Sequence, residues 1–254
     1  MDVLACIKRV PETGAKIVLT DDEMGIDTTN LGFTMSPHEE CAVEEAVQQV
    51  EEHGGSATVL TLGPEEATEQ LRTALAMKCD EATLLETEGE EWGPRATAGA
   101  VADAVRERET EFDLLLFGNE SADQANYQVG VRVARELGLP CVTGIKDLAV
   151  EDGTAVAKRE VSGGEEVYEF DLPAAITVKE GINEPRYASM RAKMQARRQE
   201  VEHVAPERGE RQGSLEKVRL EAPEEDDREA EVLGEGPDAV PAVVEMLRED
   251  VEVL

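Results

Sequence analysis

Long hydrophobic runs are absent from this 254-residue chain. The most apolar segments, such as residues 3–7 and 114–117, are far shorter than the roughly 20 residues that a membrane-spanning helix needs. The first residues have neither the basic stretch nor the cleavage site of a signal peptide. We therefore expect a cytoplasmic protein with no membrane insertion.

Cysteine pairs are also missing. Cys6, Cys41, Cys79 and Cys141 lie far apart among apolar or small residues, and no CxxC motif occurs. This spacing predicts buried thiols in a reducing compartment and no metal site.

The sequence lacks a recognisable catalytic or phosphate-binding motif. His38, His53 and His203 have no nearby nucleophile and no second histidine at a metal-binding spacing. Neither a Gly-x-Gly-x-x-Gly loop nor a Walker-type loop is present. We therefore predict no catalytic residue in the chain, which is not expected to be an enzyme by itself.

Positive charge is scarce, with 25 Lys and Arg against 57 Asp and Glu and a formal net charge of -32. The acidic residues are spread along the whole chain, which is typical of a protein from a halophilic cytoplasm, although an ordinary acidic protein is the alternative. Such a surface repels phosphate backbones, so we expect no nucleic-acid partner.

One segment breaks this acidic pattern. Residues 186–198 read R-Y-A-S-M-R-A-K-M-Q-A-R-R, with basic residues and no acidic one. A Gly and a Pro precede it, which indicates an ordered loop at its start. The contrast with the rest of the chain makes this segment a candidate partner surface.

The first 140 residues alternate short apolar runs with helical patterns. Strands are predicted at residues 3–7, 57–62, 82–85 and 113–117, and a helix start at Ser36, with Pro37 and Glu39 completing a capping box. Alternation of this kind predicts a Rossmann-like α/β fold, an open and mostly parallel sheet with flanking helices.

Consecutive strands follow, at about residues 145–150, 155–161, 167–171 and 174–178, with Gly-containing turns between them. They predict an antiparallel hairpin extension of the same sheet. We expect one α/β domain at residues 1–185, an arm at 186–200 and an extended polar C-terminal tail at 201–254.

The strand ends indicate where a ligand binds. In an open α/β sheet ligands lie outside the carboxyl ends of the strands, and here the loop at residues 118–130 is polar, contains small residues and leads into a helix. Free N–H groups at a helix start favour a phosphate. From the residues alone, a phosphate site and a solvated connection are both open.

Several motifs in order resemble one known family. They are K-R-V at residues 8–10, M-S-P-H-E-E-C-A-V-E-E-A at 35–46, L-R-T-A-L-A-M at 71–77, the loop at 118–130, L-P-A-A-I-T at 172–177 and I-N-E-P-R-Y-A-S-M-R at 182–191. The chain resembles the beta subunits of electron transfer flavoproteins, in a haloarchaeal-like version, from its first strand through residue 198.

The resemblance implies a heterodimer with an alpha subunit that carries most of the FAD site, and a C-terminal tail that wraps this subunit. Such a carrier takes electrons from acyl-CoA dehydrogenases, as in fatty acid oxidation, or from related flavin dehydrogenases, and passes them to a membrane quinone oxidoreductase. The beta subunit holds AMP or, in the bifurcating branch that oxidises NADH, a second FAD.

Carried over to this sequence, the resemblance implies a set of nucleotide contacts: Ala5, Ser36, Leu62, Gly63, Gly118, Asp123, Asn126, Gln128, Val129 and Gly130. Two positions depart from many members, which have Asn at Ser36 and an acid at Ala125. The K-R-V-P-E-T start resembles the bifurcating branch. We favour AMP and keep the second FAD as the alternative.

The resemblance also gives residues 186–200 the role of a recognition arm that docks the dehydrogenase. Met190 occupies the place of the apolar side chain that enters the partner, and Arg186, Tyr187, Arg191 and Lys193 flank it. An unbranched thioether adapts to several partner pockets. In the alternative interpretation, Met190 and Met194 only seal a helix onto the core.

Overall fold

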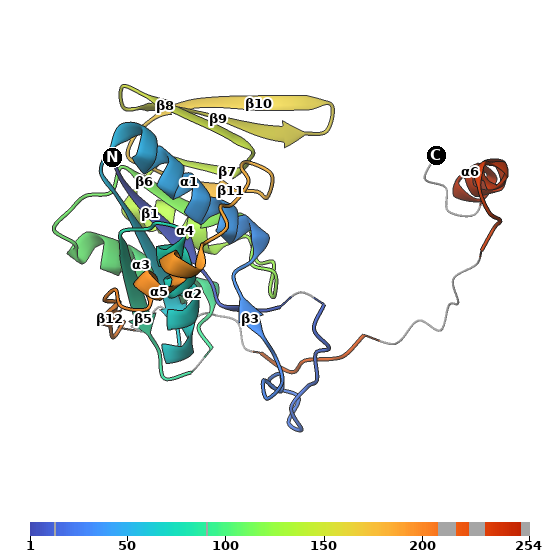
Figure 1. Ribbon diagram of the computed structural model, residues 1–254, viewed down its shortest axis with the longest axis horizontal. Coiled ribbons are helices and arrows are strands. Elements are labelled where there is room, and N and C mark those ends of the chain that lie inside the picture. Colours follow the sequence, from blue (N-terminus) through green and yellow to red (C-terminus); the bar gives the residue numbers. More distant parts are fainter. Residues whose placement is uncertain (13, 90, 208–216, 224–231, 250–254) are drawn as a thin grey trace.

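A parallel sheet of seven strands forms the centre of the computed structural model, which describes residues 1–12, 14–89, 91–207, 217–223 and 232–249. The strand order is β12-β5-β4-β1-β6-β11-β7 (Figure 1). The strands are β1 (Asp2–Ile7), β4 (Ser56–Gly63), β5 (Glu81–Glu86), β6 (Leu114–Gly118), β7 (Cys141–Ile145), β11 (Ala174–Val178) and β12 (Glu202–Val204). This sheet confirms the predicted Rossmann-like α/β class.

Helices cover both faces of the sheet. One face carries α1 (Pro37–His53), α2 (Thr68–Ala76) and α5 (Met190–Ala196), and the other carries α3 (Pro94–Glu107) and α4 (Val129–Leu137). Successive residues of β1 join different cores, Val3 and Ala5 on the α1 side and Leu4 on the α3 side, because side chains alternate along a strand. The central strands are therefore buried on both faces and mostly apolar, with a few buried polar residues such as Thr58, Thr61 and Thr177.

The antiparallel strands differ from the expectation in their placement. β8 (Asp147–Glu151), β9 (Thr154–Val161) and β10 (Gly164–Asp171) form a separate three-stranded sheet, seen at one end of the molecule in Figure 1. β11, which is buried at all five residues, instead lies between β6 and β7. A strand as exposed as β10 does not fit a sheet covered on both faces, whereas β11 does.

The remaining elements are short. A ladder of β2 (Val10–Pro11) with β3 (Phe33–Thr34) precedes α1, and η1 (Glu65–Ala67) leads into α2. Beyond β12, the described tail contains η2 (Pro237–Ala239) and α6 (Val240–Glu249), and α6 lies away from the α/β body in Figure 1. Among the described residues, no helix is long and apolar enough to span a membrane.

The thiols follow the prediction with one exception. Cys6, Cys41 and Cys79 are buried and unpaired, but Cys141 is exposed. Cys141 is the first residue of β7, an outer strand whose opening residue is not covered. A cysteine at the first position of an outer strand is therefore not always inside the core.

The core predicts the cost of truncating a central strand. Leu116 in β6 is completely buried, so Leu116→Ala should lower the free energy of unfolding by about 2–5 kcal/mol through lost burial and the cavity left behind. Val167→Ala in β10, where the side chain is 61% exposed, is the control and should change it little. Urea denaturation measures both, and equal effects would contradict this description of the core.

Candidate functional site

The carboxyl ends of β1 and β6 mark the point where the chain connections diverge. These neighbouring strands lead to α1 on one face of the sheet and to α4 on the other. Ligands of open α/β sheets bind in the crevice at such a point. A cavity of about 260 Å³ lies here, lined by the loops that follow β1, β4, β5 and β6.

Most of the predicted nucleotide contacts come together at this cavity. Seven of the ten line it: Leu62, Gly63, Gly118, Asn126, Gln128, Val129 and Gly130. Ala5 lies in the middle of β1, paired with Val59 and Leu116 on either side, and has no exposed surface. Ser36 is buried just before α1 and is not part of the lining.

Asp123 reaches the site through an ion pair. Its carboxylate accepts a hydrogen bond from Lys8 Nζ at 2.6 Å, and Lys8 lines the cavity. Burial opposes ionisation of Asp123, but the hydrogen bonds from Lys8 and Ser121 prevail and lower its pKa. The Lys8 charge is thus already matched within the chain.

A chain of buried hydrogen bonds fixes the base of the 118–130 loop. The Gly144 N–H donates to Thr177 Oγ1 at 2.8 Å, and the Thr177 hydroxyl donates to Asn119 Oδ1 at 2.9 Å. The Asn119 N–H donates to the Val178 carbonyl at 2.9 Å. The loop therefore leaves the sheet in one direction, toward the cavity.

The middle of the same loop has a strained backbone. Ala125 and Tyr127 have φ values of 46° and 54°, in the left-handed region that disfavours side chains. The Ala125 N–H donates to the Ser121 carbonyl at 3.0 Å, which helps to hold this conformation. Strained backbone of this kind is concentrated at ligand-binding segments.

Sequence reasoning missed part of the lining. Thr87 and Trp92 line the cavity from the connection between β5 and α3, and Thr97 lines it from the first turn of α3. The signal that could have found them is the carboxyl end of the strand predicted at residues 82–85. It lies at the same edge of the sheet as the ends of β1 and β6. Trp92 adds the large aromatic surface that ligand pockets commonly carry.

Glu39 is the second omission, because the sequence suggested only a capping role for it. It lines the cavity although it is 5% exposed, and the Ser36 N–H donates to its Oε2 at 3.1 Å. A Cβ at Gly118 would lie 2.7 Å from Glu39 Cγ, so only glycine allows this close approach. Burial raises the pKa of Glu39 to about 7, although Ser36 and Lys8 favour the ionised form.

The histidines form no catalytic arrangement in the part of the chain that the structure describes. His38 Nδ1 accepts a hydrogen bond from the Glu180 N–H at 2.7 Å, and its Nε2 lies 3.4 Å from Glu120. His203 pairs with Glu86 at 2.7 Å. Over the same residues, no group of acidic, histidine and cysteine side chains could hold a metal ion.

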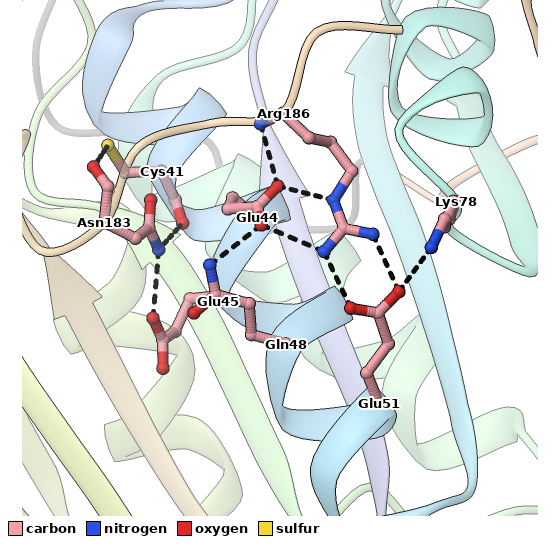
Figure 2. A network of polar contacts seen from close by, with 8 residues as sticks. All are labelled: Cys41, Glu44, Glu45, Gln48, Glu51, Lys78, Asn183 and Arg186. Atoms are coloured by element: carbon pink, nitrogen blue, oxygen red, sulfur yellow. Dashed lines mark hydrogen bonds and ion pairs between the residues drawn. The ribbon is translucent and has the colours of Figure 1, made fainter.

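Arg186, at the start of the arm, is paired within the chain (Figure 2). Its Nε lies 2.8 Å from Glu44 Oε2 and its Nη1 lies 2.8 Å from Glu51 Oε1. Lys78 also pairs with Glu51, at 2.6 Å. These contacts with α1 anchor the arm, because Glu44 is buried and needs a cation. The docking role expected of Arg186 stays a prediction.

A neighbouring amide strengthens this anchor. Asn183 Nδ2 donates to Glu45 Oε2 at 2.9 Å and to the Cys41 carbonyl at 3.1 Å (Figure 2). Hydrogen bonds from Arg186 and Lys78 lower the pKa of Glu51 to about 2. The stabilisation of the fold by these two hydrogen-bonded ion pairs is present at pH values above 4.5, the ordinary pKa of the carboxyl. It is lost as the pH falls toward 2.

The far end of the arm is held by α2. Arg72 donates to the carbonyls of Ala196 and Gln199, at 2.8 and 3.3 Å, and Ser189 Oγ caps α5 by accepting from the Ala192 N–H. The helix packs through small residues, with Ala196 only 1% exposed. The arm is therefore fixed at both ends.

The two methionines of the arm point away from the core. Met190 is 75% exposed and Met194 is 57% exposed, and Tyr187 beside them is 90% exposed. Arg191 and Lys193 are exposed as well, with Lys193 Nζ 5.1 Å from the Tyr187 ring centroid. The alternative in which Met190 and Met194 seal a helix onto the core is wrong for this chain.

The anchor predicts unequal effects of two arginine substitutions. Arg186→Ala should lower the free energy of unfolding by about 1–3 kcal/mol, because it leaves the buried Glu44 carboxylate without its cation. Arg191→Ala removes an exposed arginine of the same arm and should have almost no effect. Urea denaturation at neutral pH compares them, and a similar loss in both variants would rule out the anchor.

Known proteins that are similar in sequence identify the family of this chain. The model of the electron transfer flavoprotein domain matches residues 24–208. An electron transfer flavoprotein subunit beta of Bacillus subtilis is 37% identical over 204 residues, which cover 80% of this chain and 79% of the relative. That of Mycobacterium tuberculosis H37Rv is 37% identical over 206 residues, 79% of this chain and 77% of the relative.

A further relative belongs to a larger assembly. The caffeyl-CoA reductase-Etf complex subunit CarD of Acetobacterium woodii is 34% identical over 207 residues, which cover 79% of this chain and 77% of that subunit. The domain match spans most of the chain, and the relatives are similar over most of their own length. The chain therefore belongs to the electron transfer flavoprotein family, as one of its beta subunits.

Proposed function

We propose that this chain holds AMP and docks dehydrogenases within a heterodimeric electron carrier of the cytoplasm. The alpha subunit would contribute most of the FAD site, and the FAD would supply the redox chemistry. Electrons would pass from acyl-CoA or related flavin dehydrogenases to a membrane quinone oxidoreductase. The chain itself would bind AMP and recognise the dehydrogenases, without catalysing a reaction of its own.

The cavity at the ends of β1 and β6 is the observation that carries the nucleotide proposal. It is lined by Gln128, Val129 and Gly130 at the start of α4, where free N–H groups favour a phosphate. Trp92 and Leu62 add apolar surface suited to a base. Its volume of about 260 Å³ lies just below the roughly 300–1,000 Å³ of most ligand pockets, so a mononucleotide suits it better than the larger FAD.

The exposed side chains of the arm support the docking proposal. Tyr187, Met190, Arg191 and Lys193 face solvent on a segment that is fixed at both ends. An apolar anchor surrounded by polar groups is the usual arrangement of an interface. We assign Met190 the central contact with the dehydrogenase.

The tail supports contact with the alpha subunit. α6 has no buried residue. Its apolar side chains Val240 and Val243 are 56% and 38% exposed. A helix with an uncovered apolar side gains stability when a partner covers it. We propose that residues 201–254 wrap the alpha subunit through this helix.

Bifurcation is the second candidate function. The similarity to CarD, a subunit of a caffeyl-CoA reductase-Etf complex, favours it, as does the K-R-V-P-E-T start at residues 8–13. In that case the chain would bind a second, redox-active FAD in place of AMP, and the heterodimer would oxidise NADH.

Nucleotide extraction distinguishes the two candidates. The full chain, purified with its alpha subunit and extracted with acid, should release one AMP and one FAD per heterodimer because the cavity suits a mononucleotide. Chromatography against standards measures both. Two FAD without AMP would contradict the proposed carrier and support bifurcation, and flavin without any second nucleotide would contradict both.

Truncation of Met190 tests the docking role. Met190→Ala should raise the KM for the electron-donating dehydrogenase about tenfold, which corresponds to about 1.4 kcal/mol of lost contact, without changing flavin content. Val167→Ala, another exposed apolar residue but on β10, serves as the matched control. Steady-state electron transfer is the measurement, and an unchanged KM for the Met190 variant would contradict the docking role.

A further inference from the structure

Glu39 is the buried titratable group that the proposed function leaves without a role. It lies in the first turn of α1, lines the cavity and approaches Gly118 at the end of β6. Its contact with the Ser36 N–H serves the helix start, but that role would be served equally by an exposed carboxylate. The position of Glu39 inside a cavity proposed for an anionic ligand therefore needs a separate explanation.

No cation neutralises Glu39 among the described residues. Lys8 favours the ionised form of Glu39, but its ammonium pairs with Asp123 at 2.6 Å. The other titratable groups around this point are Cys6 on β1, whose pKa is raised by burial, Arg9 after β1, Glu91 before α3, Glu120 and Tyr127 on the loop after β6, and His38 and Glu40 on α1 itself. Arg9 carries a positive charge, but its guanidinium lies over the Phe33 ring, 3.3 Å from the ring centroid. None of them supplies a matched positive charge to the Glu39 carboxylate.

A phosphate in the same cavity would therefore meet an ionised Glu39 as a like charge. Like charges raise the pKa of a carboxyl, so the anion would favour the protonated form. Since burial already raises the pKa of Glu39 to about 7, Glu39 changes its protonation at physiological pH.

We propose that Glu39 takes up a proton when an anionic nucleotide binds in this cavity, and thereby makes nucleotide affinity depend on pH. The proposal rests on the proposed function, because it assumes that the cavity is the nucleotide site. The sign follows from linkage: the bound state has the higher pKa, so affinity is full below the pKa of the free site and falls as the pH rises above it.

Isothermal titration of AMP into the nucleotide-stripped heterodimer provides the test. A shift of about one pKa unit on binding gives a roughly fivefold loss of affinity between pH 7 and 9, and an uptake of about half a proton per AMP at pH 7.5. Two buffers with different ionisation enthalpies count the protons directly. The phosphate itself ionises near pH 6 and contributes little above pH 7.5.

Glu39→Gln assigns the effect to its residue. The amide can still accept the hydrogen bond from the Ser36 N–H, so α1 should keep its start, while proton uptake and pH dependence should disappear. Glu40→Gln, the neighbouring carboxyl outside the cavity lining, is the matched control and should keep both. If Glu39→Gln fails to fold, the absence of proton uptake by the unsubstituted protein in the two buffers would still overturn the proposal.

Each outcome has a distinct meaning. AMP binding with no proton uptake and no pH dependence would overturn the role of Glu39 and leave the nucleotide site intact. Uptake that persists in Glu39→Gln would assign the proton to another group and would also overturn it. If AMP bound at no pH, the proposed nucleotide function would fail, and the proton linkage with it.

Discussion

Burial of glutamates on α1 is the constraint that connects the cavity with the arm. Glu39, Glu44 and Glu45 all lie against the interior with at most 5% exposure, in a chain with few cations to match them. A buried carboxylate needs hydrogen bonds or a countercharge. α1 obtains these partly from its own residues and partly from distant segments, which are thereby held against the helix.

The three carboxyl groups meet this need in different ways. Glu44 has the guanidinium of Arg186, and Glu45 has the amides of Gln49 and Asn183. These contacts bring the residues before the arm against the helix, more than 130 residues away in the sequence. Glu39 has backbone N–H groups and little compensating charge, which is why its pKa is raised where that of Glu44 is lowered.

The sequence predicted the sheet, and it pointed to the edge of the sheet where the candidate cavity lies, because both depend on local patterns. Apolar runs of the right length identified the central strands, and the polar loop at 118–130 followed directly from the end of one of them. The lining by Trp92 and Thr97 depends on which strand ends share an edge, and Glu39 depends on burial of a capping residue, so neither followed from spacing.

Long-range pairing limited the prediction elsewhere. The anchoring role of Arg186 could not be predicted because its partners, Glu44 and Glu51, lie on a distant helix. The place of β11 between β6 and β7, and the separation of the antiparallel strands from the main sheet, depend on which strand is buried on both faces. A main-chain contact at Ala5 was inferred from resemblance, but the ladders to β4 and β6 flank that residue on both sides.

The small antiparallel sheet ends at β10, which among the described strands pairs with β9 alone and so leaves its other edge open. Open edges invite pairing with a second molecule. β10 places four carboxylates, Glu165, Glu166, Glu169 and Asp171, within eight residues. A second copy would bring the same charges to the same line, so mutual repulsion opposes edge-to-edge aggregation and helps to keep these molecules separate at low ionic strength.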